Sequence, residues 1–338
     1  MFGVHGAAQA RRNPARLHSG TGFRPDRGTV LMIRITRPGK QGITLENPVM
    51  NAAGILGWGD AYRDVIDWSK LGAFVTNPVS LAMRSPANGT RVVPLDAGML
   101  VHTGLPNLGL SKTIDTYRAA WERLPIPVIL HLIATTPDEI MRCMERIESE
   151  DIIAGVELGL DDDIAVPEAA ALVRAACERW EKPVLVRLPF GEKHDFARAM
   201  IGAGAGGLVL CAAPRGTARD AAGRLVPGRL YGTWIKPLVL RQVGQMAREL
   251  NAPIVAAGGI HSPQDARDFL EAGANAIQVD SAVWIRPEIL NLIASDLGGM
   301  TVTQPSGALA DEWHTGMTDT ERASKAGELP TKEDRKKK

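Results

Sequence analysis

The sequence predicts an α/β protein whose single domain forms a closed (β/α)8 barrel, the TIM-barrel architecture. Eight short apolar runs of strand length occur along the chain, and most are followed by a stretch with helical periodicity. The runs show little alternation of polar and apolar residues, which is typical of parallel strands buried on both faces. Eight strand-helix units in 338 residues favour a closed barrel over an open doubly wound sheet.

The predicted strands are rich in Val, Ile, Leu and Ala and are bounded by Gly, Pro or polar residues. We place them near residues 49–53, 73–76, 128–133, 154–158, 184–188, 207–211, 254–257 and 276–279. Helices are predicted over residues 111–123, 137–148, 167–180, 193–203, 235–250, 263–272 and 287–297. Thr136 and Ser262 mark two helix starts. Each is an N-cap residue that is followed directly by proline, and an acidic side chain lies three positions after the cap.

The composition is that of an ordinary globular protein, with 45% hydrophobic and 23% charged residues. The net charge of +1 gives no general attraction to nucleic acid or to membranes, so neither is expected as a partner. No apolar stretch approaches the roughly 18 residues that span a bilayer. The three cysteines are far apart and indicate no disulfide framework, so a reducing, cytoplasmic setting is expected.

The barrel pattern covers residues 32–299, which we assign to one domain. Residues 1–31 are rich in Arg, Gly and Pro with little apolar content, and we expect a disordered N-terminal extension or a gene start placed too far upstream. A transit peptide is the alternative, although the segment lacks amphipathic helical spacing. Residues 300–338 are polar and mixed in charge, and we expect a loosely held C-terminal tail.

The stretch of residues 253–282 combines two buried strands, the helix between them and a pair of glycines. Gly258 and Gly259 end the first of these strands, where glycine lets backbone amides approach an anion closely. The pair predicts either a phosphate cradle or only a tight turn. Active sites of barrels are built by loops at the carboxyl ends of the strands, so the long loops at 77–110 and 212–234 are expected to be functional lids.

Seven short motifs run in order along the chain between Ile33 and Gly298. They are NPVMNAAG at 47–54, LGAFVTN at 71–77, GLPNLG at 104–109, PVLVRLP at 183–189, IKP at 235–237, AAGGI at 256–260 and QVDSA at 278–282. Their order and spacing resemble the dihydroorotate dehydrogenase family, FMN-dependent barrels of the class 1, soluble type. The resemblance implies an oxidoreductase linked to pyrimidine biosynthesis.

The resemblance implies where FMN would bind. The flavin ring would lie across the barrel mouth against Ala52, Ala53 and Gly54, whose small side chains permit close approach of a planar ring. The phosphate would meet backbone amides at Gly258 and Gly259 and around Ser281. The other cofactor-binding positions that the resemblance implies are Thr76, Asn77, Arg187, Gly232 and Asp280.

The resemblance also implies catalytic and substrate-binding roles. Arg187 stands where the family has a lysine that contacts the flavin, and its charge would stabilise the reduced cofactor. The family's cysteine or serine base is missing, and Asp162 takes its place when no gap is introduced; a carboxylate can serve as a base when burial raises its pKa. The alternative is that Asp162 belongs to a solvated acidic loop. Asn107 matches a substrate-binding residue of the family, and His102 lies in the same long loop.

His131 stands where the family has an asparagine, at the end of the third strand. We predict that it is an acid, a flavin contact or a ligand, and a purely structural histidine is the alternative. Together with His102 and the acidic run 161–163 it could hold a metal ion, but no metal site is assigned.

Further departures from the family concern the substrate. The family's second-strand lysine is Asn77, and two of its asparagines are Val101 and Ala212. Each buried polar group left without a partner costs about 1–3 kcal/mol, so a substrate other than dihydroorotate is expected. Asp280 replaces a glycine beside the expected phosphate, where one anion would face another.

These observations lead to an FMN-dependent oxidoreductase acting on a C–C bond of a small, anionic substrate, either as a homodimer or with a reductase subunit. The alternative is a catalytically degenerate barrel that serves as a ligand-binding or scaffold subunit. A tRNA dihydrouridine synthase-like enzyme shares the barrel, but the balanced charge disfavours an RNA-binding surface.

Overall fold

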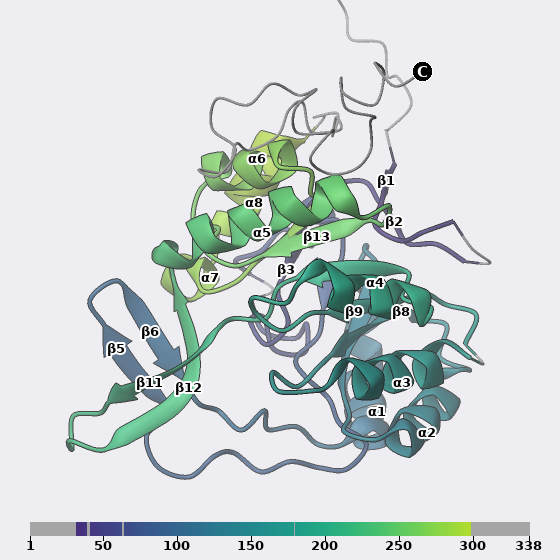
Figure 1. Cartoon of the computed structure of the whole chain (residues 1–338), viewed down its shortest axis with the longest axis horizontal. Helices are drawn as coiled ribbons and strands as arrows, with labels where there is room; N and C mark the ends of the chain where they lie inside the picture. Colours follow the sequence, from purple (N-terminus) through teal and green to yellow (C-terminus); the bar gives the residue numbers. More distant parts are fainter. Residues whose placement is uncertain (1–31, 39–40, 63, 179, 299–338) are drawn as a thin grey trace, which may run out of the picture. The chain divides into compact units, whose positions relative to one another are not determined.

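The computed structural model describes residues 32–298 except 39–40, 63 and 179. The predicted N-terminal extension and C-terminal tail therefore lie outside the described residues. Eight parallel strands form a barrel, which confirms the predicted fold class (Figure 1). The strands are β3 (Val49–Asn51), β4 (Phe74–Val75), β7 (Val128–Ile133), β8 (Ile153–Gly159), β9 (Val184–Arg187), β10 (Gly207–Leu210), β13 (Ile254–Ala257) and β14 (Ala276–Val279).

The strands follow chain order around the barrel, and β14 pairs with β3 to bring the two ends together. The remaining seam, between β3 and β4, has one parallel bridge between Met50 and Ala73. The side chain of Asn51 strengthens this seam, because its Oδ1 accepts from the Val75 amide at 3.1 Å and its Nδ2 donates to the Val75 carbonyl at 2.6 Å. A buried amide thus replaces ladder hydrogen bonds that the short strands do not make.

Seven helices lie close to the predicted ranges. They are α1 (Leu110–Trp121), α2 (Pro137–Ile147), α3 (Val166–Cys177), α4 (His194–Gly202), α5 (Lys236–Glu249), α6 (Pro263–Glu271) and α8 (Ile289–Leu297). The predicted caps are confirmed, since the Thr136 and Ser262 side chains accept from the amides of Glu139 and Asp265. Short helices η1 (Trp68–Lys70), η2 (Thr233–Ile235) and α7 (Ala282–Ile285) were not predicted. In the described part of the chain, no helix has the length and apolar character needed to cross a bilayer.

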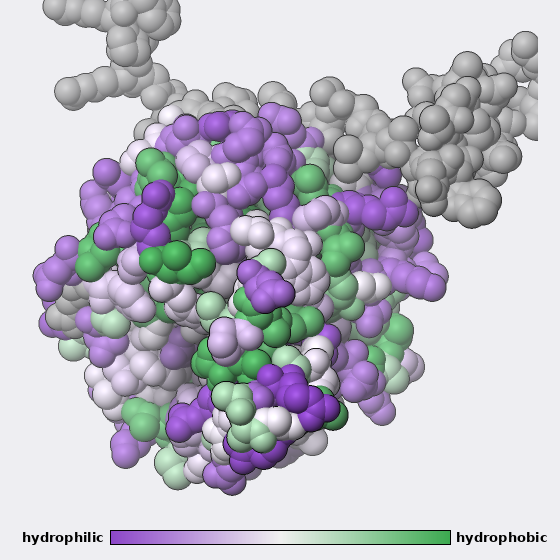
Figure 2. Space-filling model, turned by 90° about the vertical axis from the view of Figure 1, so that its left-hand side faces the viewer, coloured by the Kyte–Doolittle hydropathy of each residue, from purple (hydrophilic) through white to green (hydrophobic). Residues whose placement is uncertain are grey.

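The two long loops form a sheet that the sequence did not indicate. Its strands are β5 (Val92–Leu95), β6 (Gly98–Val101), β11 (Arg215–Arg219) and β12 (Leu225–Gly232), in the order β11-β12-β6-β5 (Figure 1). We call it the lid sheet. Val93, Leu100 and Val226 form its small core. Figure 2, which faces the side where this sheet lies in Figure 1, shows hydrophobic surface between hydrophilic areas.

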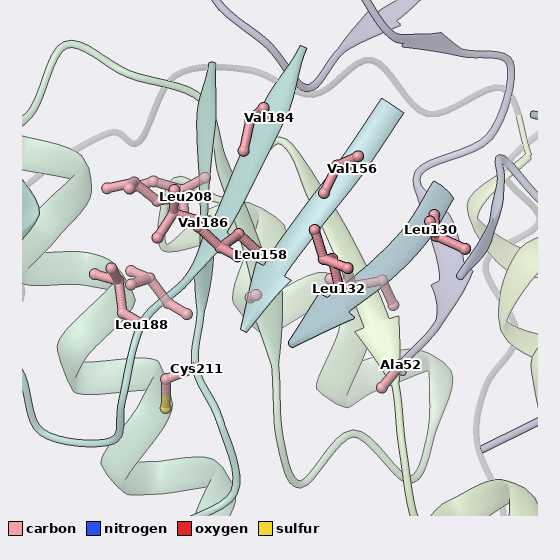
Figure 3. Packing of buried hydrophobic residues seen from close by; sticks show 14 of the residues in the cluster. Ala52, Leu130, Leu132, Val156, Leu158, Val184, Val186, Leu188, Leu208 and Cys211 are labelled. Atoms are coloured by element: carbon pink, nitrogen blue, oxygen red, sulfur yellow. The ribbon is translucent and has the colours of Figure 1, made fainter. Parts of the chain in front are cut away.

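Side chains of the barrel strands alternate between two cores. The outer core packs against the helices. Figure 3 shows part of it, namely Leu130, Leu132, Val156, Leu158, Val184, Val186, Leu188 and Leu208. Residues between these positions point into the barrel, where Ile129, Leu185 and Val209 form an apolar layer. Hairpin strands β1 (Ile33–Arg34) and β2 (Thr44–Leu45) pack against this layer through Ile33 and Leu45.

Candidate active site at the barrel mouth

Four strands each place one polar side chain inside the barrel, on the carboxyl side of the apolar layer. Each lies two residues beyond an inward-facing position of its strand, and side chains two apart share a face. The four residues are His131 on β7, Glu157 on β8, Arg187 on β9 and Gln278 on β14. We call them the polar layer. Because the carboxyl ends of the strands face the mouth, this layer is the floor of the candidate site.

Glu157 is hydrogen-bonded to the other three members of the polar layer. Its Oε1 accepts from His131 Nδ1 at 2.9 Å and from Arg187 Nη1 at 3.0 Å, and its Oε2 accepts from Gln278 Nε2 at 2.5 Å. Arg187 also donates to Gln278 Oε1 at 2.8 Å and to the Cys211 carbonyl at 3.3 Å. A fully buried carboxylate is thereby surrounded by donors, as burial of a charge requires.

The electrostatics keep this pair charged. Burial by itself would raise the pKa of Glu157, but the charge of Arg187 and the hydrogen bonds from His131 and Gln278 outweigh it and lower that pKa to about 2. Burial likewise opposes the charge of Arg187, yet the neighbouring Glu157 carboxylate raises the pKa of the guanidinium. The ionised Glu157 can only accept, so His131 Nδ1 carries the proton that they share.

Glu157 and Gln278 were missed as site residues in the sequence analysis. The available signal was a charged or amide side chain inside a run of apolar strand residues, in Val-Glu-Leu and Ile-Gln-Val. Such residues cannot be buried without partners, so their presence in predicted core strands indicates a polar cluster.

Glu157 makes the stability of the fold depend on pH in the acidic range. Its folded-state pKa of about 2 lies below the ordinary value of 4.5, so the unfolded chain takes up the proton first as pH falls. The stabilising contribution is therefore complete above pH 4.5 and is lost as pH falls toward 2. We expect the difference in Tm between the wild type and Glu157→Gln to shrink between about pH 6 and about pH 3. An unchanged difference in thermal melts would contradict this assignment.

The ring of His131 is fixed on one side and open on the other. The residue is 5% exposed, and its backbone amide donates to Thr76 Oγ1 at 3.1 Å. Its Nε2 forms no hydrogen bond with any described residue. A Cβ at Gly159 would lie 2.8 Å from this nitrogen, so glycine leaves the space that the ring occupies. Glu157 thus holds Nδ1, whereas Nε2 has no hydrogen-bond partner among the described residues.

Asp162, the predicted base, lies in a double ion pair between the loop after β8 and the lid sheet. Its Oδ2 accepts from Arg215 Nε at 2.5 Å, and its two oxygens accept from Arg229 Nη1 and Nη2 at 2.9 Å each. Arg229 also donates to the Ala213 carbonyl at 2.7 Å. Asp162 is therefore a clasp that fastens the lid sheet, and its oxygens are already occupied. Its role as a base stays a prediction.

Two substitutions distinguish a structural role of Asp162 in the clasp from a catalytic role. We expect Asp162→Asn and Arg229→Met to increase amide hydrogen exchange across residues 212–234 by about 5- to 30-fold, because each removes charged hydrogen bonds worth about 1–2 kcal/mol. Arg219→Met is the matched control, since among the described residues the side chain of this arginine of the same sheet is hydrogen-bonded to the Gly223 carbonyl and to no carboxylate. Suppose that Arg229→Met increases hydrogen exchange in the lid sheet but leaves turnover intact. Loss of turnover in Asp162→Asn would then support Asp162 as the base.

The predicted substrate residues have local roles in the structure. Asn107 is 6% exposed, and its Oδ1 accepts from the Gly109 amide at 2.9 Å. Its Nδ2 donates to Ser80 Oγ at 3.0 Å and to the Leu105 carbonyl at 3.1 Å. Asn107 thus holds the loop before α1. The backbone amide of His102 donates to the Arg91 carbonyl, and the side chain is half-buried. Substrate contact by either residue stays a prediction.

The positions expected under a flavin ring directly follow the barrel strands β3 and β4. Ala52 is buried, Ala53 is half-buried and Gly54 is exposed with a φ of +84°. Thr76 is fully buried and donates to the Asn77 carbonyl at 2.9 Å. Asn77 Oδ1 is buried without a hydrogen-bond partner among the described residues. An unsatisfied acceptor at the mouth fits a ligand that carries an N–H or O–H group.

The predicted phosphate cradle consists of glycines that no other residue could replace without movement. Gly259 has a φ of +71°, and a Cβ there would lie 2.5 Å from the Lys236 nitrogen. A Cβ at Gly232 would lie 2.4 Å from the Ala97 carbonyl oxygen. The amides of Gly258 and Gly259 donate to no backbone carbonyl of the described residues. These free donors fit a phosphate group.

Asp280 and Ser281 complete this region. Both are nearly fully buried, and Asp280 Oδ1 accepts from the Ser281 amide at 2.6 Å. Burial is the largest influence on Asp280 and raises its pKa. A phosphate at the glycine cradle would therefore lie beside a buried carboxyl group whose charge is disfavoured by burial.

A metal site is not formed by the residues considered above. Across the described ranges, no group of three or more His, Cys, Asp or Glu side chains could hold a metal ion. His131 lies with Glu157, whereas the acidic run 161–163 turns to the lid sheet through Asp162.

Comparisons with known proteins identify the family of this chain. A family model described as dihydroorotate dehydrogenase matches residues 40–300. The catalytic subunit of dihydroorotate dehydrogenase B (NAD(+)) from Pelobacter propionicus is 35% identical over 274 residues, which cover 76% of this chain and 90% of the relative. The subunit of the same name from Trichlorobacter lovleyi is 33% identical, and the match covers 75% of this chain and 90% of the relative. The one from Geotalea uraniireducens is 32% identical, and the match covers 80% of this chain and 93% of the relative. The chain therefore belongs to the dihydroorotate dehydrogenase family.

Proposed function

We propose that the chain is an FMN-dependent oxidoreductase that acts on a C–C bond of a small substrate at the barrel mouth. The observation that carries the proposal is the polar layer, in which Glu157 orients His131 and neutralises a buried Arg187. Family membership supplies the reaction class. The free glycine amides and the unsatisfied Asn77 Oδ1 support a bound cofactor.

His131 would replace the missing cysteine or serine base. Oxidation of a C–C bond removes one hydrogen as a hydride and one as a proton, and the bound flavin would supply the hydride acceptor. His131 Nε2 would accept the proton, and the resulting imidazolium would be stabilised by the Glu157 carboxylate at Nδ1. In the reverse direction the same nitrogen would donate the proton to the substrate.

Arg187 would stabilise negative charge at the mouth. Its side chain is 13% exposed, and one guanidinium nitrogen is held by Glu157 and Gln278. A charge fixed in this way costs little reorganisation when negative charge develops nearby. Arg187 would therefore favour an anionic reduced cofactor, which is the role expected from its position in the fifth strand.

The substrate we propose is small and anionic, and it need not be dihydroorotate. The relatives are named for dihydroorotate, but this chain has Asn77, Val101, His131 and Ala212 where the family has a lysine and three asparagines. A site that lacks hydrogen-bonding partners for a substrate discriminates against it. Dihydroorotate and other small acids with a saturated C–C bond are therefore the first compounds to compare.

The relatives' names also suggest a partner. Each is called a catalytic subunit of an NAD(+)-linked enzyme, so we propose that this chain works either with a reductase subunit or as a homodimer. Size-exclusion chromatography with light scattering on the native protein distinguishes a lone chain, a pair and a complex of two kinds of subunit.

A catalytically degenerate barrel that binds a ligand or supports other subunits is the second candidate. Two observations favour it: Asp162 is engaged in the lid clasp, and the amide of Asn107 is satisfied within its own loop. Asp162 is therefore not free to replace the family's missing base, and Asn107 is not free to bind a substrate.

The visible absorbance of the purified protein separates the two candidates. We expect a flavin spectrum, release of FMN on heat denaturation as identified by mass spectrometry, and bleaching when an anaerobic sample is mixed with the right reduced substrate. A colourless protein that cannot be loaded with FMN or riboflavin would contradict the oxidoreductase and leave the ligand-binding or scaffold barrel.

A further inference from the structure

Two loops meet beside the glycine cradle. Residues 258–262 follow β13, the seventh barrel strand, and residues 280–281 follow β14, the eighth. The strands are neighbours in the sheet, and His261 Nε2 lies 3.4 Å from Ser281 Oγ. Loops after the seventh and eighth strands commonly form a phosphate site in barrels of this kind. A buried carboxylate in this place is therefore unexpected.

The carboxylate of Asp280 already uses a donor of this region. Its Oδ1 accepts from the Ser281 amide at 2.6 Å and from Ser281 Oγ at 3.1 Å. No hydrogen bond from a described residue reaches Oδ2. The residue is only 4% exposed, so water screens it poorly.

Four titratable groups on other elements face Asp280. They are His261 after β13, Arg187 on β9, Cys211 after β10 and Tyr231 on β12. Of the two that can be cationic, Arg187 is already paired with Glu157, and His261 lies against Ser281. Burial raises the pKa of Cys211 to about 12, so its thiol is neutral. Among the described residues, no lysine and no arginine other than the paired Arg187 faces Asp280.

We propose that Asp280 determines how the cofactor's phosphate is recognised: the acid form donates its O–H to a phosphate oxygen, and the carboxylate form repels the phosphate. This inference rests on the proposed function, because it assumes that a flavin occupies the mouth. The glycine amides and the Asp280 O–H then act together as donors, and binding of the phosphate takes up one proton. The raised pKa of Asp280 agrees with this role.

Two consequences follow from proton uptake. Where Asp280 is ionised in the free protein, the affinity for FMN falls about tenfold for each rise of one pH unit. Riboflavin has the same ring and ribityl chain but no phosphate, so its affinity stays constant over the same range. The phosphate itself titrates near pH 6, so measurements above about pH 7.5 exclude its ionisation, and riboflavin controls for ionisations unrelated to the phosphate.

The test is a fluorescence titration of the flavin-stripped full chain with FMN and with riboflavin between about pH 7.5 and about pH 9.5. We expect the Kd for FMN to rise about 100-fold across this range and the Kd for riboflavin to stay within about threefold. Asp280→Asn keeps the shape and a permanent N–H donor, so its Kd for FMN is expected to be independent of pH. Asp280→Gly, with the repelling group removed, is expected to bind FMN more tightly than the wild type at the alkaline end. Thermal melts of both variants check that they fold.

Other outcomes overturn the inference in distinguishable ways. A Kd for FMN that is constant with pH, and equal in wild type and Asp280→Asn, refutes the role of Asp280 and leaves the flavoenzyme proposal intact. Failure of FMN and riboflavin to bind the wild type and both folded variants at any pH refutes the flavoenzyme proposal, and this inference with it.

Discussion

Replacing Glu157 by glutamine is expected to lower the free energy of unfolding by about 3–5 kcal/mol, because it leaves the charge of Arg187 buried without a counter-ion. The carboxylate is fully buried and accepts three hydrogen bonds, from His131, Arg187 and Gln278. The amide of glutamine can accept at only one of its two terminal atoms, so it also presents a donor to groups that are themselves donors. Urea unfolding at neutral pH measures the change.

Two further variants give this prediction a control and a rescue. Asp195→Asn removes a carboxylate whose side chain is 96% exposed and 3.3 Å from Arg198, and it should change stability by no more than about 0.5 kcal/mol. Adding Arg187→Met to Glu157→Gln removes the orphaned charge and should restore part of the lost stability. A double variant less stable than Glu157→Gln alone would mean that the ion pair is not the source of the loss.

His131→Gln is expected to reduce turnover by about 10²- to 10⁴-fold, the usual contribution of a positioned acid or base. Glutamine keeps an N–H that can donate to Glu157, so the buried carboxylate is not left unpaired and the fold should remain. The measurement is the rate of flavin bleaching after anaerobic mixing with the substrate found in the screen described above.

Cys211 provides the matched comparison for His131. Its thiol is 2% exposed at the end of a barrel strand, and burial raises its pKa to about 12, so it is not expected to serve as a thiolate base. The hydrogen bond from Arg187 goes to the Cys211 backbone carbonyl, and Cys211→Ser leaves it in place. We expect turnover of Cys211→Ser within about threefold of the wild type. If Cys211→Ser lost turnover and His131→Gln kept it, the base would be the thiol of Cys211 and not His131.

The elements that the sequence predicted well are those specified by neighbouring residues. Strand β13 follows from a continuous apolar run, and helix α6 from the Ser262 cap, the following proline and an apolar face. His131 and Arg187 were selected because they stand at family positions near the ends of barrel strands, and both are found in the polar layer. Glu157 could not be assigned from its neighbours, because its three partners come from other strands of the barrel.

The lid sheet could not be predicted in the same way. Strand β12 pairs with β6 through Arg229 and Val101, which are more than a hundred residues apart. The hairpins β5-β6 and β11-β12 are each local, but they form one sheet only through the pairing of β12 with β6. The clasp of Asp162 depends on the same pairing, since Arg215 and Arg229 are brought to it by the sheet.

By itself, then, the sequence determined the barrel, its order of strands and helices, and the family, because local periodicity, caps and glycines specify each unit without reference to distant residues. Only the tertiary structure decided which polar residues act together. Closure of the barrel places His131, Glu157, Arg187 and Gln278 in one buried layer, where low dielectric and shared hydrogen bonds make their charges depend on one another. The same closure brings a buried Asp280 to the glycine cradle, and no pattern along the chain measures that proximity.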